Sequence, residues 1–305
     1  MSLFALVGSP AEGGISPNAA PAPGGAVPSD AIMVTPWSTG TGTGDAAVRD
    51  TDRTVPYASR KGTAADFEIV SASGLGFPAG MTNVAKSTCA SNSPSNVGVR
   101  IQAASSPGLS TPAVGTDRYY RLYRRVDMPD LYISSGGDGL IHQPQDADSG
   151  TGNTTFQFEI YYNSDGTWEF EFYLNDTSLG ANLRRYVLPA ALTKGVVYRF
   201  EWRVHVVSST TVWVDARVYD SSDVLLYSSE DFTRKTGLDT MAAQNIFTIP
   251  GVANLRGLQM GSNSWSVDPA DIGGGLGDQI SHYDGGLMIR TDDWCGAFSD
   301  QEEDW

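Results

Sequence analysis

The chain has 305 residues, including 34 glycines, and carries a formal net charge of −15 at pH 7. A chain of this length can form a hydrophobic core of useful size without disulfide bonds or structural metals. Its acidity argues against nucleic acid or an anionic membrane as a partner, because both bind basic surfaces.

The N-terminal residues 1–58 come first along the chain, and as far as about Gly44 they are rich in Gly and Pro. Such a segment buries too little surface to repay the backbone entropy lost on ordering. We expect it to be an extended assembly arm held by other copies of the chain or by other proteins. Packing of the arm along its own domain is the alternative.

No targeting signal is evident in the first ten residues, MSLFALVGSP, because no positive charge precedes their apolar run. No window is long and apolar enough to span a membrane. We therefore expect a soluble protein made in a cytoplasm. The two cysteines, Cys89 and Cys295, lack the spacing of a zinc site, and the sequence leaves open whether they pair.

Short segments with alternating apolar and polar residues follow from about Asp66, and this period of two is typical of strands with one face in a core. The clearest are two hairpins. Residues 154–163 and 168–176 flank an Asp-Gly turn, and residues 196–207 and 211–221 flank a short polar link. Further strands are expected at 66–73, 98–105, 117–128, 223–230, 255–262 and 278–290, and a short helix at 235–247.

The apolar faces of the two hairpins predict part of the core. The residues expected there are Phe156, Phe158, Phe170, Phe172, Phe200, Trp202, Val212 and Val214. Many short strands with almost no helical periodicity predict an all-β fold, a two-sheet antiparallel jelly-roll sandwich. The expected organisation is the extended arm at 1–58, the jelly-roll domain at 59–297 and an acidic C-terminal tail at 298–305.

The strand order between Asp66 and Ala297, the adjacent segments YRFEWRVHV and TVWVDARVYD, and the ending ISHYDGGLMIRTDDWCG resemble concanavalin A-like jelly rolls of the laminin-G-like and glucanase type. The resemblance implies a concave sheet that meets saccharide and, in some relatives, a bound calcium ion. Glucanases of this type carry an E-x-D-x-E triplet on one strand. Here Glu169 and Glu171 are followed by Tyr173, so that motif is incomplete.

The polar faces of the two hairpins supply the candidate site. If all four strands are neighbours, most of these residues form an ordinary solvated surface with weak cross-strand ion pairs. A sugar-binding platform is the second interpretation, because exposed aromatic rings stack on sugars. The candidate carbohydrate-contacting residues are Tyr161, Glu171, Tyr173, Arg199, Arg203, His205, Trp213 and Tyr219.

An enzymatic interpretation also fits the residue types on this face. Elimination on a uronate polymer needs a base, for which His205 or Tyr173 qualifies, and a cation to neutralise the carboxylate, for which Arg199 or Arg203 qualifies. The lone histidines His142 and His282 are expected to be structural. No cofactor is expected, although the oxygen-rich segments 146–153, 175–182 and 268–278 could wrap a calcium ion.

No catalytic motif is recognised, and this absence together with the arm favours a non-enzymatic structural protein of a bacteriophage virion. Minor tail, fibre and capsid decoration proteins are the candidates, located in the virion and made in the host cytoplasm. Residues 1–58 would bind other copies of the chain and other virion proteins, and a host-surface glycan is a further candidate partner. The alternatives are a polysaccharide lyase or glycoside hydrolase of the concanavalin A-like fold and a free-standing lectin.

Overall fold

The computed structural model describes residues 29–35, 42–43, 59–61, 67–89, 97–101, 109–127, 156–162, 167–175, 183–234, 240–244, 246–249, 251–252, 255, 258–262 and 280–298. No helix in these ranges has the length and apolar character needed to cross a membrane.

Strands make up nearly all the regular structure of the described ranges. They are β1 (Ala31–Thr35), β2 (Gly42–Thr43), β3 (Ser59–Lys61), β4 (Phe67–Ser71), β5 (Asn83–Cys89), β6 (Val97–Ile101), β7 (Asp117–Asp127), β8 (Phe156–Tyr162), β9 (Thr167–Asn175), β10 (Leu183–Val187), β11 (Leu192–Thr193), β12 (Val197–Ser208), β13 (Thr211–Tyr219), β14 (Leu225–Ser228), β15 (Thr233–Arg234), β16 (Ile246–Thr248), β17 (Leu258–Ser262) and β18 (Ile280–Arg290), with the 3₁₀ helix η3 (Ala242–Gln244) between β15 and β16.

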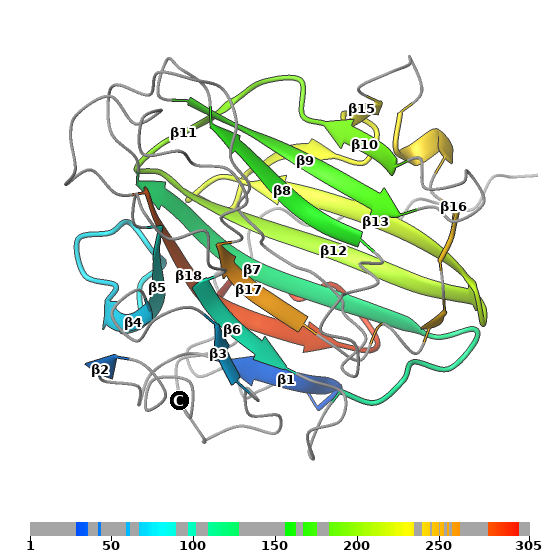
Figure 1. Cartoon of the computed structure of the whole chain (residues 1–305), viewed down its shortest axis with the longest axis horizontal. Helices are drawn as coiled ribbons and strands as arrows, with labels where there is room; N and C mark the ends of the chain where they lie inside the picture. Colours follow the sequence, from blue (N-terminus) through cyan, green and yellow to red (C-terminus); the bar gives the residue numbers. More distant parts are fainter. Residues whose placement is uncertain are drawn as a thin grey trace, which may run out of the picture.

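The largest sheet has ten antiparallel strands, and its long central members are β12, β7 and β18 (Figure 1). Its order is β14-β13-β12-β7-β18-β5-β4-β2, while β16 also pairs with β13 and β1 also pairs with β18. Strands distant in sequence are therefore neighbours: β7 lies between β12 and β18.

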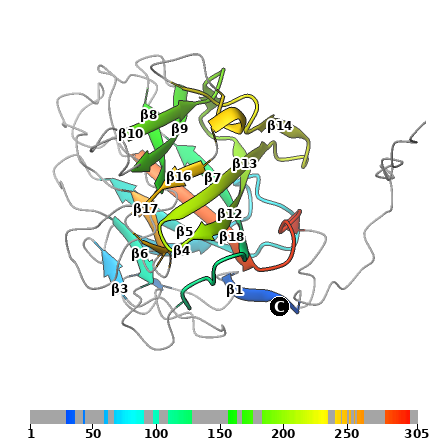
Figure 2. The ribbon, with the colours of Figure 1, turned by 90° about the vertical axis from the view of Figure 1, so that its right-hand side faces the viewer.

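A second, five-stranded sheet packs over the first, as the two views in Figures 1 and 2 show. In it β9 pairs with β8 on one side and with β10 and β11 on the other, and β10 also pairs with β15. Strands β17, β6 and β3 form a small third sheet. The described chain is thus an all-β jelly-roll sandwich, as the sequence predicted.

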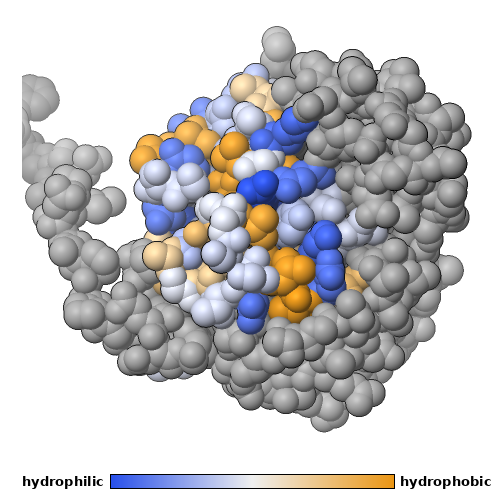
Figure 3. Space-filling model, turned by 90° about the vertical axis from the view of Figure 1, so that its left-hand side faces the viewer, coloured by the Kyte–Doolittle hydropathy of each residue, from blue (hydrophilic) through white to orange (hydrophobic). Residues whose placement is uncertain are grey.

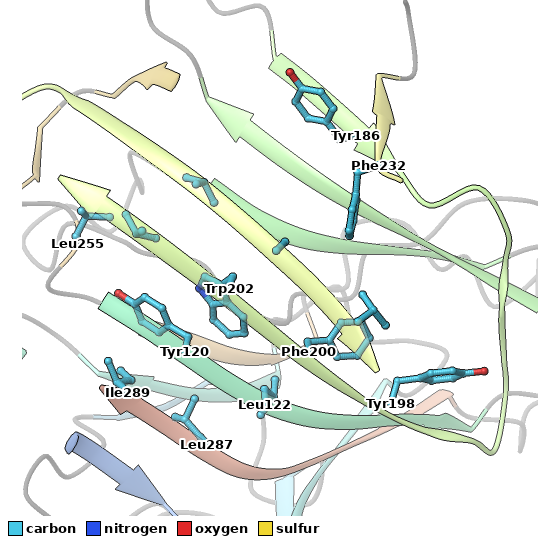
Figure 4. Packing of buried hydrophobic residues seen from close by; sticks show 14 of the residues in the cluster. Tyr120, Leu122, Tyr186, Tyr198, Phe200, Trp202, Phe232, Leu255, Leu287 and Ile289 are labelled. Atoms are coloured by element: carbon cyan, nitrogen blue, oxygen red, sulfur yellow. The ribbon is translucent and has the colours of Figure 1, made fainter. Parts of the chain in front are cut away.

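The main core lies between the two larger sheets (Figure 4). The even-numbered side chains of β12 and β13 point into it, and the rings of Tyr120 and Trp202 stack there with centroids 5.0 Å apart. Tyr186 and Phe232 enter from the second sheet. The core therefore joins both layers by burial of apolar area, the main favourable term in folding.

Half of the predicted core residues can be assessed. Phe200, Trp202, Val212 and Val214 are at most 1% exposed, which confirms the prediction for the second hairpin. Phe156, Phe158, Phe170 and Phe172 lie on β8 and β9, whose side chains are outside the described part of the structure.

Strand β1 corrects the expectation that the sandwich begins near Asp66. Residues 31–35 pair antiparallel with β18, although they fall within the segment predicted to be an assembly arm. The sequence AIMVT is apolar and partly β-branched, which suits a strand at this position. Residues 1–28 of the predicted arm lie outside the described residues.

The C-terminal end of the domain extends to Phe298, the first residue of the predicted acidic tail. Phe298 is buried, and its backbone N–H donates a hydrogen bond to the Tyr123 hydroxyl at 2.7 Å. Residues 299–305 are outside the described ranges. In the region expected to be helical, the described helix is the three-residue η3.

Candidate functional site

The predicted site residues are divided between two sheets. Tyr161, Glu171 and Tyr173 lie on β8 and β9 of the five-stranded sheet. Arg199, Arg203, His205, Trp213 and Tyr219 lie on β12 and β13 of the ten-stranded sheet. The four strands are therefore not a row of neighbours, because the local alternation that predicted the hairpins does not specify which sheet each hairpin joins.

The second group occupies the outer face of the large sheet, the face that carries the odd-numbered side chains of β7, β12 and β13. The even-numbered apolar side chains of these strands fill the core, so alternation directs the odd-numbered ones away from it. Strand register then sets the neighbours. His205 lies opposite Asp117 on β7 and Trp213 on β13, and Arg203 lies opposite Tyr119 and Asp215.

Asp117 ties His205 and Arg203 together. Its Oδ1 lies 3.0 Å from His205 Nδ1 and accepts a hydrogen bond of 2.8 Å from Arg203 Nε. All three side chains remain reachable by solvent, with exposed fractions of 32% for His205, 30% for Arg203 and 22% for Asp117. We call these three residues the outer-face cluster.

The contact with Asp117 assigns the two ring nitrogens of His205 different roles. A carboxylate only accepts hydrogen bonds, so it favours the tautomer with the proton on Nδ1. The lone pair of Nε2 then stays available to take a proton. His205 therefore has the arrangement expected of an oriented general base.

Aromatic rings flank the cluster on both sides. The guanidinium of Arg203 lies 4.7 Å from the Trp213 ring centroid and 5.5 Å from that of Tyr119. The hydrogen bond to Asp117 outweighs partial burial and raises the pKa of Arg203 above its usual value. In the described part of the chain, the hydrogen bond of Arg203 uses only Nε, so its two terminal nitrogens can still donate to a ligand.

The other end of the outer face is buried. Arg199 is 4% exposed, lies 3.8 Å from the Tyr219 ring centroid and pairs with Asp223 at 2.9 Å. Burial raises the pKa of Glu201 despite the nearby Arg199. Arg199 and Tyr219 are therefore structural here, and of the two candidate cations only Arg203 is accessible.

A C-terminal strap, residues 294–298, covers this buried end. The Arg217 guanidinium lies 3.8 Å from the Trp294 ring centroid, and the Gly296 carbonyl accepts a 3.2 Å hydrogen bond from Arg121 Nη1. Cys295 is a free, buried thiol whose pKa is raised by burial. The strap therefore limits the accessible platform to the end of the outer face that holds the outer-face cluster.

Two cavities adjoin the described surface, and only one of them reaches the outer-face cluster. A cavity of about 580 Å³ at the start of β7 is lined by Asp117 together with Thr116, Thr291 and Asp292. A larger one of about 740 Å³ is lined by residues 71–82 alone. We regard the smaller cavity as the relevant one because it shares Asp117 with the cluster. On the side of the molecule shown in Figure 3, hydrophilic and hydrophobic residues are interspersed over the described surface.

Sequence reasoning missed Asp117 and Tyr119. Both belong to the predicted strand 117–128, and their odd numbering places them on one face of that strand. The missing information was the pairing of β7 with β12, which are separated by 69 residues and by the four strands β8 to β11. Local patterning carries no signal for that pairing.

The remaining candidates are structural or outside the described ranges. His282 is fully buried on β18, and burial, followed by the nearby Arg124, lowers its pKa well below the usual value. His142 and most of the three oxygen-rich segments fall outside the described ranges. Within the described residues, no cluster of three or more His, Cys, Asp or Glu side chains could hold a metal ion.

Comparison with known proteins gives similarity of fold only. No protein-family model and no curated protein matches the chain. An endo-β-1,4-glucuronan lyase from the fungus Trichoderma reesei is 13% identical, with a TM-score of 0.46 over 86% of this chain and 98% of its own. The alginate lyase Aly36B is 12% identical, with a TM-score of 0.44 over 88% of this chain and 99% of its own. A PL-14 alginate lyase from Aplysia kurodai is 12% identical, with a TM-score of 0.41 over 76% and 89%.

These comparisons correct the functional prediction. The three similar structures named above are polysaccharide lyases, so the prediction of a non-enzymatic structural protein of a bacteriophage virion is wrong, and its virion setting has no support. At these identities the similarity concerns only the arrangement of strands. The substrates named for those lyases therefore describe those proteins and not this chain.

Proposed function

We propose that the chain is a polysaccharide lyase that cleaves a uronate-containing polymer at the outer-face cluster. The observation that supports this proposal is the contact of Asp117 with both His205 and Arg203 at the accessible end of the outer face. It provides an oriented base and a cation side by side, which are the two groups that elimination requires.

The proposed reaction uses these groups in one sequence of bond changes. The terminal nitrogens of Arg203 bind the C6 carboxylate of a uronate, which stabilises the charge that develops when the C5 proton leaves. His205 Nε2 takes that proton, and its electron pair forms the C4–C5 double bond as the C4–O bond breaks. The departing oxygen takes a proton from water, and the protonated His205 returns its proton to the resulting hydroxide, so the step balances without an external oxidant.

Of the two rings beside the cluster, that of Trp213 would position the polymer, because Tyr119 is buried. Trp213 is partly exposed on the strand next to His205, where its face can stack on a sugar ring. Tyr173, the other candidate base, lies on β9 in the five-stranded sheet. Its separation from β12 favours His205.

A carbohydrate-binding protein without turnover is the second candidate. The Arg203 charge is opposed by Asp117 and Asp215, so the cluster has little net positive charge with which to bind a uronate. Such a site would suit stacking and hydrogen bonding to sugar hydroxyls. Binding of a polymer without formation of an unsaturated product would support this candidate.

The test compares the wild-type protein with His205→Ala and with Val207→Ala, an exposed residue on the same face of β12 that serves as the matched control. The assay follows the ultraviolet absorbance of unsaturated uronate released from alginate, glucuronan and hyaluronan. We expect His205→Ala to lower the rate by about 10²–10⁴-fold, the usual contribution of a positioned base, and Val207→Ala to leave it unchanged. Equal rates in all three proteins would refute the role of His205.

A further inference from the structure

The cavity at the start of β7 is lined by acidic residues, whereas a site that recognises a negatively charged uronate is expected to be basic. The residues that line it include two with carboxylate side chains, Asp117 and Asp292, and two with hydroxyl side chains, Thr116 and Thr291. Carboxylates accept hydrogen bonds from sugar hydroxyls. The hydroxyl oxygens of Thr116 and Thr291 can accept as well, because their own protons are donated to the Ala113 carbonyl and to Asp292 Oδ1. The wall therefore suits a hydroxyl-rich, uncharged ligand, while a third carboxylate brought beside these two would be repelled.

The cavity wall also contains the basic residue Arg118, but the charge of Arg118 does not offset the negative charge of the wall toward a ligand. Arg118 is 3% exposed, and its guanidinium donates to the Leu255 carbonyl at 3.0 Å and to the Ser110 carbonyl. Its hydrogen bonds are therefore directed at the protein's own backbone. The cation available to a ligand is Arg203, which contacts Asp117 from the outer-face cluster and does not line the cavity.

Arg290, which ends β18 just before Thr291, is also committed within the protein. Its Nε and Nη2 donate to the Asp30 carboxylate, and Nη1 donates to the Trp294 carbonyl at 2.9 Å. Partial burial acts to raise the pKa of Asp30, but the hydrogen bonds from Arg290 and from the Asp292 backbone hold that pKa below its usual value. This ion pair leaves Asp292 as an exposed carboxylate at the cavity.

We infer that the cavity is a subsite for a neutral sugar, so that the substrate is a mixed polymer in which uronate neighbours an uncharged sugar. This inference rests on the proposed function, because it places the uronate at the outer-face cluster. Asp117 joins the two sites: it orients His205 and also lines the cavity. A polymer made of uronate alone would bring a carboxylate against Asp117 and Asp292.

Two polymers that share glucuronate test the inference: hyaluronan, in which glucuronate alternates with a neutral N-acetylated sugar, and glucuronan, which contains glucuronate alone. We expect wild-type kcat/KM to be about tenfold or more higher on hyaluronan, because like-charge contacts suppress the wrong partner. Asp292→Lys should shift this ratio toward glucuronan by about tenfold. The matched control is Asp293→Lys, because Asp293 is exposed beside Asp292 and does not line the cavity.

A wild-type ratio near one, or equal effects of the two lysine variants, would overturn the neutral subsite while leaving the lyase proposal intact. If neither polymer yields unsaturated uronate, the proposed function fails, and the subsite is then tested by calorimetry with a neutral β-1,4-linked gluco-oligosaccharide. Weaker binding in Asp292→Ala than in Asp293→Ala would support the subsite. Equal binding in the two variants would refute it.

Discussion

Burial divides the titratable side chains of the large sheet into two groups. His205, Arg203 and Asp117 stay partly exposed on the outer face, where a ligand can reach them. His282, Arg124 and Asp284 are enclosed on the inner face, where Arg124 Nη2 donates to Asp284 Oδ2 at 2.6 Å. Residue types common in active sites thus occur on both faces, and exposure distinguishes the groups that can perform chemistry from those that stabilise the fold.

The buried His282 predicts a pH dependence of stability. Burial, followed by the charge of Arg124, lowers its pKa in the folded state, so the unfolded chain binds one more proton below the ordinary pKa of 6.5. The contribution of His282 to the free energy of unfolding is therefore fully present above about pH 6.5. It is lost as pH falls, by about 1.4 kcal/mol per pH unit, until the pKa of His282 in the folded state is reached.

Urea denaturation of wild type and of His282→Gln between about pH 7 and pH 5 measures this effect. The wild-type free energy of unfolding should fall with the steeper slope. Ile289→Val, a buried substitution without a titratable group, should lower stability while keeping the wild-type slope. Parallel curves for wild type and His282→Gln would show that His282 does not contribute.

Strands β12 and β13 show what the sequence could predict at the scale of an element. Alternation predicted cross-strand ion pairs on the polar face of this hairpin, and the observed register places Glu201 opposite Arg217 and Arg203 opposite Asp215. The same reasoning could not assign β8 and β9 to the other sheet or bring β7 beside β12, because strand order depends on packing between distant segments. The sequence therefore predicted that Arg203, His205 and Trp213 share one face of the hairpin, but not that Asp117 lies beside them.

A glycine in β18 allows that strand to change register. The pairing of β18 with β7 shifts between Gly285 and Met288, and Gly286 adopts a φ of +57° there. A Cβ at Gly286 would lie 2.9 Å from Met81 Cε and 3.2 Å from Tyr123 Cδ2. The irregularity thus depends on a residue that lacks a side chain.

Gly286→Ala should therefore destabilise the protein more than Gly74→Ala. Gly74 also has a positive φ, of +77°, but its added Cβ would meet nothing within 4 Å, so it reports backbone strain alone. The crowding at Gly286 should add about 1–3 kcal/mol. Chemical denaturation of both variants measures the difference, and equal losses would contradict the crowding argument.

The ion pair between Asp30, just before β1, and Arg290, at the end of β18, predicts another effect on stability. The side chains of Asp30 and Arg290 are 10% and 15% exposed, and Asp30→Ala would leave the guanidinium without its carboxylate. We expect a loss of about 2–4 kcal/mol in unfolding free energy. Glu68→Ala is the control, because the Lys86–Glu68 pair is more exposed and should contribute less than about 1 kcal/mol. Similar losses would show that Asp30 does not fasten β1 to the sheet.

Although the chain is acidic overall, its fold brings several basic side chains together on the large sheet. The chain has 35 acidic and 20 basic residues, yet arginines from β7, β12, β13 and β18 gather on the large sheet. Most of them pair within the protein, including Arg121, Arg124 and Arg290. Arg203 pairs with Asp117 through Nε, keeps its terminal nitrogens available as donors, and lies beside the partly exposed His205. For this reason an acidic protein can be proposed to act on an acidic polymer.

The mass of the products formed from hyaluronan and glucuronan tests the central claim most directly. Elimination at the outer-face cluster predicts oligosaccharides that are lighter by one water than hydrolysis products, with the double bond on the uronate at the new chain end. These products should form with the wild-type protein and be lost in His205→Ala. Products of full hydrolytic mass, or uncleaved polymer after incubation with a folded wild-type protein, would contradict the account.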